Sequence, residues 1–191
     1  DSDGANHRFI TTGRSTALTP RYSPDYRQLV YLSYVDGNPR IYVYDVGTGS
    51  QTLVTESANP TFAPRWSPDG RYILYSMAVG GNTDIYRVPV TGGQSTRLTD
   101  APGIDIGGSF SLDGRQIVFE SDRSGNQQCY VMNADGTNQR RISFGSSRCA
   151  TPEWSPRGDQ IAFTNASNFN IYVMTPSGGN ARRLTSGWQD E

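Results

Sequence analysis

Lysine is absent from the 191 residues, histidine occurs once, as His7, and only two cysteines are present, Cys129 and Cys149. The 17 basic side chains are therefore all arginine, and they face 18 acidic ones, for a net charge of −1. This balance gives no overall field that would attract phosphate backbones, so nucleic acid is not an expected partner. No apolar run reaches the roughly 18 residues of a membrane-spanning helix, so direct membrane insertion is not expected either.

The beginning of the sequence carries no recognisable targeting segment. Residues Asp1–Gly4 lack the charged-then-apolar profile of a signal peptide, and there is no initiating methionine. This start suggests a processed or truncated chain.

Residue types that catalysis or metal binding would need are also scarce. A Ser-His-Asp hydrolase needs a histidine, and His7 lies near the terminus of the sequence. Two cysteines and one remote histidine cannot form a closed tetrahedral zinc site. Asn133–Gly136 resembles the opening of a calcium loop but lacks its ligand spacing. We therefore expect no enzyme activity, no metal and no cofactor.

Glycine, proline and tyrosine, in contrast, are plentiful. The sequence has 21 glycines, 11 prolines and 11 tyrosines. This composition favours many short strands joined by tight turns. The expected fold class is all-β.

An internal repeat of 44 residues organises the sequence. An aromatic residue followed by a turn motif close to Ser-Pro-Asp-Gly recurs in one phase, at Tyr22, Trp66, Phe110 and Trp154. Each motif precedes a β-branched strand, a variable hairpin, a tyrosine-bearing strand, a glycine turn and a last strand such as Arg97–Thr99; Phe9–Thr11, before the first motif, is a last strand of the same kind. Units of this length with four antiparallel strands are typical of β-propeller blades.

The repeats divide the chain into one partial propeller domain. Cutting after each tyrosine-bearing strand gives units 1–44, 45–88, 89–132 and 133–174, and an incomplete unit 175–191. Both ends lie inside a repeat, so we expect the chain to be part of a larger ring.

Most repeated residues have a packing or turn role. The aromatic residues at 22, 66, 110 and 154 are suited to fill the wedge between blades, and glycine at 70, 114 and 158 permits positive φ. Asp25, Asp69 and Asp113 should accept backbone N–H groups in the turns. The motif departs from this pattern at Tyr26 and Arg157, which makes these two turns harder to predict.

The two cysteines occupy different places in the repeat. Cys129 takes the position of Ile41 and Ile85, which suggests a small buried apolar residue, and Cys149 lies in the segment that leads into the next blade. A bridge would have to join a strand of one blade to the start of the next. We therefore favour two unbridged cysteines.

Positions that differ between repeats are the best pointer to function, because packing does not explain them. The most variable segments join each blade to the innermost strand of the next, and they crowd one mouth of the central channel. These channel-mouth loops are 14–19, 58–63, 101–107 and 146–151. They carry Asp105, Arg14 and Arg148 among small and apolar residues, which suits a protein or peptide partner.

Several segments resemble one known family. Trp66–Tyr75 followed by Asp84–Val88, together with Asn170–Thr185, closely resembles blades of TolB, the periplasmic component of the Tol-Pal envelope system of Gram-negative bacteria. Asn133–Ile142 and Asp1–Ile10 are similar to TolB as well. The resemblance covers nearly the whole chain.

The resemblance implies a six-bladed propeller preceded by a small α/β domain, of which about four blades are present. It implies a periplasmic, non-enzymatic protein that acts in envelope integrity, cell division and protein or colicin import. Its channel-mouth loops would bind the peptidoglycan-associated lipoprotein Pal and colicin peptides, with other Tol proteins as further partners. Combined with the charged residues of the loops, the expected partner-binding positions are Thr61, Ala63, Asp105, Ile106, Gly107, Arg148 and Thr151. Pro60 and Gly107 depart from the family's usual polar residues.

The residues leave other interpretations open. The same blades occur in the substrate-gating propellers of prolyl oligopeptidase and dipeptidyl peptidase relatives, whose catalytic domain would lie outside this chain. A lectin is disfavoured because no aromatic residue repeats in the variable loops. Open blade edges are an association hazard, so self-association of copies remains open as well.

Overall fold

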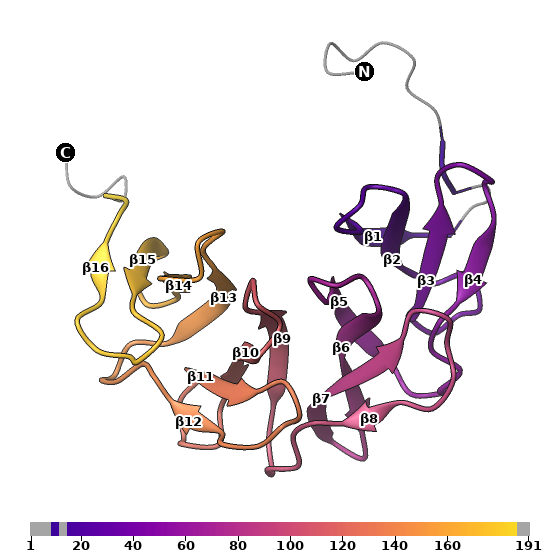
Figure 1. Ribbon diagram of the computed structural model, residues 1–191. Coiled ribbons are helices and arrows are strands. Elements are labelled where there is room, and N and C mark those ends of the chain that lie inside the picture. Colours follow the sequence, from indigo (N-terminus) through magenta and orange to yellow (C-terminus); the bar gives the residue numbers. More distant parts are fainter. Residues whose placement is uncertain (1–8, 12–14, 187–191) are drawn as a thin grey trace.

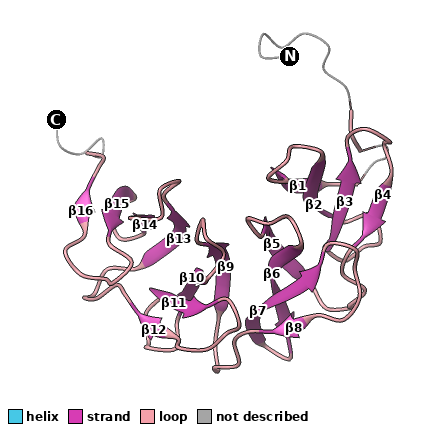
Figure 2. Ribbon diagram, viewed as in Figure 1, coloured by secondary structure: helices cyan, strands magenta, loops and turns pink. Residues whose placement is uncertain are grey.

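The described chain consists of four consecutive antiparallel sheets of four strands each (Figures 1 and 2). The structure is a computed structural model, and it describes residues 9–11 and 15–186. The first sheet comprises β1 (Ala17–Tyr22), β2 (Gln28–Ser33), β3 (Arg40–Asp45) and β4 (Gln51–Leu53), and the second comprises β5 (Thr61–Trp66), β6 (Tyr72–Val79), β7 (Asn82–Pro89) and β8 (Thr96–Arg97). The third comprises β9 (Asp105–Phe110), β10 (Gln116–Ser121), β11 (Gln128–Asn133) and β12 (Arg140–Arg141), and the fourth comprises β13 (Cys149–Trp154), β14 (Ile161–Asn165), β15 (Asn170–Met174) and β16 (Arg182–Arg183).

Each sheet is a simple meander in which sequential strands are neighbours. The sheets follow one another around an arc whose first and last sheets lie apart (Figure 1). The all-β class and the propeller-type blades are thus confirmed. Residues Phe9–Thr11, expected as a strand, instead form an irregular segment with bends.

The core lies between neighbouring sheets. Val30, Ile41 and Val43 of the first sheet pack in one buried cluster with Ile73 and Tyr75 of the second. Equivalent clusters join the second sheet to the third and the third to the fourth. Burial of these apolar side chains between blades is the main force that holds the arc together.

The repeated aromatic residue closes the wedge at three of its four positions. Trp66, Phe110 and Trp154 are half-buried and pack against these clusters. The Trp66 indole Nε1 also donates to the backbone oxygen of Arg21 in the preceding sheet, at 3.0 Å. Tyr22 differs from the prediction, since it is 55% exposed and contacts the ring of Tyr26. No described sheet precedes β1 to cover it.

The Ser-Pro-Asp-Gly turns are built as predicted. In the second sheet, the Asp69 carboxylate accepts the Ser67 hydroxyl at 2.5 Å and the backbone N–H of Arg71 at 3.1 Å. The Ser67 hydrogen bond is the main cause that lowers the pKa of Asp69. The fourth sheet keeps the contact by another route, because Ser155 donates to Asp159 at 2.8 Å. Tyr26 adopts the left-handed φ of 61° that glycine has elsewhere.

The glycine turns before the last strands let neighbouring blades approach closely. A Cβ built on Gly136 would lie 2.6 Å from the backbone oxygen of Leu98 in the preceding sheet. A Cβ on Gly178 would meet the backbone oxygen of Ile142 at the same distance. Glycine at these positions is therefore part of the blade packing as well as of the turn.

The two cysteines form a disulfide, contrary to the prediction of unbridged thiols. Cys129 on β11 and Cys149 at the start of β13 have Cα atoms 5.5 Å apart, within the usual range for a bridge. Both are buried in the cluster between the third and fourth sheets. The prediction was wrong because the third strand of one blade lies beside the innermost strand of the next, as the hydrogen bond from the Cys149 N–H to the Gln127 oxygen shows.

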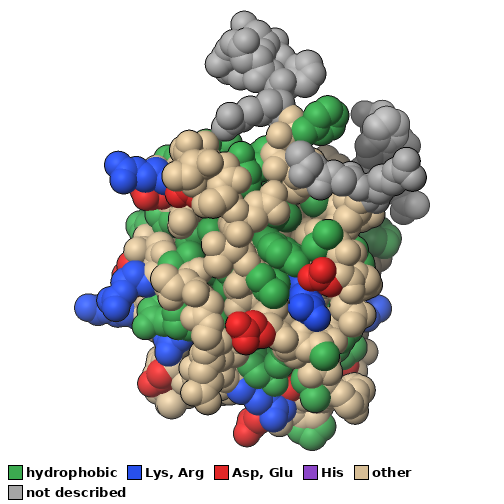
Figure 3. Space-filling view, turned by 90° about the vertical axis from the view of Figure 1, so that its right-hand side faces the viewer, with side chains coloured by type: hydrophobic (Ala, Val, Ile, Leu, Met, Phe, Trp, Pro, Cys, Tyr) green, Lys and Arg blue, Asp and Glu red, His purple; other side chains and the backbone are tan. Residues whose placement is uncertain are grey.

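The surface carries charges of both signs. On the side shown in Figure 3, where β3 and β4 lie in Figure 1, acidic and basic side chains are interspersed and neither forms a continuous patch. Within the described ranges, no helix is long and apolar enough to cross a membrane.

Candidate functional site

Each channel-mouth loop meets the β-hairpin of its own blade at one end of the arc. The N–H of Ala78 donates to the oxygen of Pro60, and the N–H of Ala166 donates to the oxygen of Arg148. A third bond of this kind runs from Asp122 to Ile104. We call this end, formed by 58–63, 101–107 and 146–151 with hairpins 34–39, 78–83, 122–127 and 166–169, the mouth face.

Six of the seven predicted partner-binding residues lie in strands and not in loops. Thr61 and Ala63 belong to β5, Thr151 belongs to β13, and Asp105, Ile106 and Gly107 belong to β9. Arg148 alone precedes its strand and is exposed. The predicted loops extend too far toward the C-terminus, because the innermost strand already pairs with its neighbour several residues before the repeated aromatic residue. Thr61, for example, pairs with Met77.

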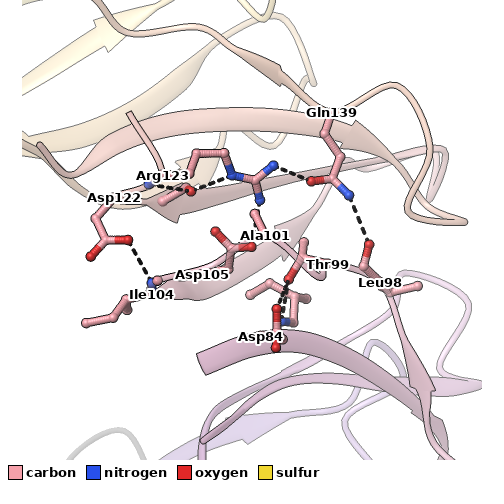
Figure 4. Close-up of polar contacts among 12 residues, drawn as sticks. Asp84, Leu98, Thr99, Ala101, Ile104, Asp105, Asp122, Arg123 and Gln139 are labelled. Carbon is pink, nitrogen blue, oxygen red and sulfur yellow. Dashed lines mark hydrogen bonds and ion pairs between the residues drawn. The ribbon is translucent and has the colours of Figure 1, made fainter. Parts of the chain in front are cut away.

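Thr61 and Asp105 are buried and already engaged. Thr61 has no exposed surface, and its hydroxyl donates to the backbone oxygen of Pro39 at 3.0 Å. The Asp105 carboxylate, 1% exposed, pairs with the Arg123 guanidinium at 2.6 Å. Figure 4 shows this guanidinium between Asp105 and Gln139, whose side-chain oxygen it also contacts at 2.6 Å. Both residues therefore support the mouth face from within.

Burial and hydrogen bonding act on Asp105 in opposite directions. Removal from water raises the pKa of its carboxyl group, while the Ser121 hydroxyl and the Arg123 charge lower it. Burial is the largest cause, so the net direction is upward. The ion pair with Arg123 compensates a charge that would otherwise be costly in this environment.

The same bulge interrupts the innermost strand of every blade. The register shifts within each of β1, β5, β9 and β13. One residue of each bulge has a left-handed φ, namely 52° at Thr19, 50° at Ala63, 71° at Gly107 and 49° at Thr151. This conformation is unfavourable for a β-branched residue such as threonine. The predicted positions Ala63, Gly107 and Thr151 are thus the same structural position in three blades.

Glu120, which the sequence analysis did not single out, fixes one of these bulges. Its carboxylate accepts the backbone N–H of Thr151 at 2.6 Å and also the side-chain amide of Gln127. The side chain is largely buried, and this burial raises the pKa of Glu120. In the second sheet Ser76, one repeat earlier, accepts the N–H of Gly107 at 3.3 Å. The available signal was an acidic residue directly after the apolar triplet Ile117–Phe119.

The rim of the mouth face exposes bulky apolar side chains. The hairpins contribute Val35 (59% exposed), Val79 (40%) and Phe169 (83%), and a channel-mouth loop contributes Ile104 (46%). Arg148 and Thr151 are exposed beside them. Apolar groups with an arginine at the edge are features of protein-binding surfaces.

The described residues contain no cluster of side chains that could hold a metal ion. Within 9–11 and 15–186, no three side chains of His, Cys, Asp or Glu come together as a metal site would require. The one histidine, His7, lies outside the described residues, as does Arg14. The fold defines a protein built of propeller-type blades, with an apolar rim exposed on its mouth face.

Comparison with known proteins identifies the family. The family model described as TolB beta propeller domain matches residues 1–191, and the chain belongs to this family. The Tol-Pal system protein TolB of Gluconobacter oxydans is 44% identical over 98% of the chain and 42% of its own length. The chain is therefore a TolB propeller domain, and the TolB proteins of the Tol-Pal system are non-enzymatic.

Solved structures agree with this assignment. TolB from Acinetobacter baumannii superposes with a TM-score of 0.85 at 30% identity, over all of this chain and 49% of that one. A putative TolB from Agrobacterium tumefaciens gives 0.79 at 31% identity, over 86% of this chain and 63% of that one. The chain thus spans about half the length of its relatives. A puromycin hydrolase with a TM-score of 0.70 is 17% identical, which shows a shared fold alone.

Proposed function

We propose that the chain is a periplasmic protein-binding module that binds the lipoprotein Pal at its mouth face. In this proposal its role in envelope integrity, cell division and protein or colicin import follows from that contact and from contacts with other Tol proteins. Membership of the TolB propeller family supports the class of partner. We also propose that the four sheets form part of a six-bladed ring.

The exposed apolar rim is the observation that carries the proposal. Side chains such as Phe169 and Ile104 lie uncovered next to a backbone that the repeated bulges hold in one conformation. A preorganised surface loses little conformational entropy on binding, and exposed apolar groups gain from burial. Ala63 and Ile106 are half-buried and would contribute at the inner edge of the contact.

The disulfide supports the proposed compartment. Structural disulfides persist in oxidising environments such as the bacterial periplasm and are rare in the cytosol. The bridge between Cys129 and Cys149 is buried between two blades, where it links the third sheet to the mouth face of the fourth.

Thr151→Arg is the sharpest test of the mouth face. Thr151 is exposed and its φ lies in the left-handed region. Arginine is not β-branched, so it should adopt this conformation with no more backbone strain than threonine. Its bulk and charge would obstruct a partner at this face. We expect the variant to fold normally and to bind Pal from the same bacterium at least tenfold more weakly, as measured by calorimetry.

Gln160→Arg is the matched control. It adds the same charge to an exposed position of the same sheet, but at the opposite end from the mouth face. The control should bind Pal like the parent. Equal binding by parent and Thr151→Arg would show that the mouth face is wrongly assigned, and a folded parent without affinity for Pal would overturn the proposed function.

A further inference from the structure

The opposite end of the arc carries a second hollowed surface. The innermost strands start at the mouth face and end at the Ser-Pro-Asp-Gly turns, so each strand of six residues separates the two ends by roughly 20 Å. Two neighbouring hollows, of about 420 and 320 Å³, lie at the turn end. They share Ser67, Pro68, Phe110 and Leu112, and we call the combined surface the turn-end groove.

Leu112 is the departure from the repeat that shapes this groove. The other three turns have proline at this position, as Pro24, Pro68 and Pro156. Leu112 is 61% exposed and borders both hollows, next to the half-buried ring of Phe110. The turn does not require a leucine at this position, because the other three turns have proline there. An exposed leucine between two hollows is therefore a candidate contact for an apolar group.

Basic side chains line each hollow. In the larger hollow, the guanidinium of Arg87 lies over the ring of Tyr72 at 4.7 Å and donates to the backbone oxygen of Ala134. In the other, Arg65 on β5 reaches Glu153 on β13 at a long 3.5 Å, across the intervening third sheet. Only about a quarter of the Arg65 side chain is exposed. Its charge is therefore partly desolvated and is compensated by a single long ion pair, with Glu153.

The acidic residues around the groove are less available than the basic ones. Asp69 and Asp113 each accept a serine hydroxyl and a backbone N–H within their own turns. Glu153 is in the pair with Arg65. The Trp154 indole Nε1, which lies at the same hollow, is a buried donor without a partner among the described residues. The groove therefore offers cations, a donor and apolar surface.

We propose that the turn-end groove binds an extended peptide segment of a partner protein in which an acidic residue lies beside a bulky apolar one. The apolar side chain contacts Leu112 and Phe110, and the carboxylate contacts Arg65 or Arg87. The groove favours a carboxylate over an amine, because a carboxylate could approach the guanidinium of Arg65 or Arg87 more closely than their present partners do. The turn-end groove and the mouth face lie at opposite ends of the innermost strands. A test of peptide binding at the groove is therefore independent of the test of Pal binding.

Two acetylated hexapeptides serve as probes, one alternating glutamate and leucine and one alternating lysine and leucine. Calorimetry with the full chain should show the acidic peptide binding at least tenfold more tightly than the basic one. Leu112→Pro restores the repeat residue and should weaken the acidic peptide at least fivefold without loss of structure by circular dichroism. Arg87→Gln should reduce the preference for the acidic peptide.

Phe169→Ser is the control, since it removes an exposed apolar side chain from the mouth face and should leave peptide binding unchanged. Leu112→Ser provides a second variant in case the proline disturbs the turn. Equal affinity for both peptides, or unchanged binding in both Leu112 variants, would overturn the proposal. So would a sedimentation result in which the chain dimerises and Leu112→Pro abolishes the dimer, because the groove would then be covered by a second copy.

Discussion

Removal of the disulfide should destabilise the chain by an amount that its position in the fold determines. The bridge links Cys129 and Cys149 across 20 positions of sequence. The bridge stabilises the folded chain because it restricts the conformations of the unfolded chain. For a loop of this length, the chain-entropy relation gives a stabilisation of about 3 kcal/mol at 25 °C. For a chain of this size, that change corresponds to a decrease in Tm of about 8 °C.

The assay compares the oxidised and reduced forms of the unaltered protein by urea denaturation. This comparison keeps both sulfur atoms in the buried cluster, so it isolates the constraint from packing. Cys129→Ala with Cys149→Ala should cost more than reduction, because the truncated side chains also leave space between the third and fourth sheets.

The m-value supplies an independent check. A reduced unfolded chain is more expanded, so unfolding exposes more surface and the m-value should rise on reduction. If the reduced and oxidised forms unfolded at the same urea concentration with the same m-value, the assignment of the stability to restriction of the unfolded chain would be refuted.

Three further predictions concern blade packing and buried charge. Gly136→Ala places a Cβ 2.6 Å from a carbonyl oxygen of the preceding sheet and should lower the Tm. The control is Gly125→Ala, where φ is also positive but nothing lies within 4 Å of the added Cβ, and its Tm should fall less. Equal decreases in Tm would contradict the close approach at Gly136. Arg123→Met leaves a buried carboxylate unpaired and should cost about 3 to 5 kcal/mol in urea unfolding, whereas Arg115→Met, which removes an exposed pair at 4.0 Å, should cost less than about 1 kcal/mol. Because burial raises the pKa of Glu120, the folded chain holds this proton more tightly than the unfolded chain, so the free energy of unfolding should fall as pH rises from the ordinary value of 4.5 through the raised one. Glu120→Gln should reduce that slope, and an unchanged slope would mean that another group causes it.

The architecture was predictable because each repeat places the same residue types at the same strand positions. A 44-residue period with a proline-glycine turn and alternating apolar strands admits few folds, and the structure has the meander of four strands in each blade. The turn chemistry followed from the same logic, since a short acid beside serine has local donors to accept, as at Asp69.

The contacts between blades were less predictable. Periodicity describes one blade at a time, whereas the disulfide and the burial of Thr61 depend on how the third strand of one blade lies beside the innermost strand of the next. The bond from the Thr61 N–H to the Pro39 oxygen and the equivalent bond from Cys149 to Gln127 show that this geometry recurs. With this rule, two cysteines in those strands would be expected to pair.

The bulges were hidden from the sequence for a different reason. Glycine occupies the left-handed position in one blade only, while Thr19, Ala63 and Thr151 occupy it in the others. Residues with such different intrinsic preferences share one conformation because tertiary contacts impose it, as the Glu120 carboxylate does on the N–H of Thr151. The relevant signal lies on the preceding blade and not at the bulge.

The residues two positions after the bulge also differ from blade to blade. They are Arg21, Arg65, Ser109 and Glu153, so one structural position holds two cations, a hydroxyl and an anion in four successive blades. A consensus of the repeats does not show this variation. The ion pair between Arg65 and Glu153 nevertheless joins the second and fourth sheets, which are not neighbours. Packing requires none of these identities, because Ser109 and Glu153 occupy equivalent backbone positions in adjacent blades. Blade packing therefore does not determine which residue stands at this position, and the pair between Arg65 and Glu153 could not be predicted from the repeat.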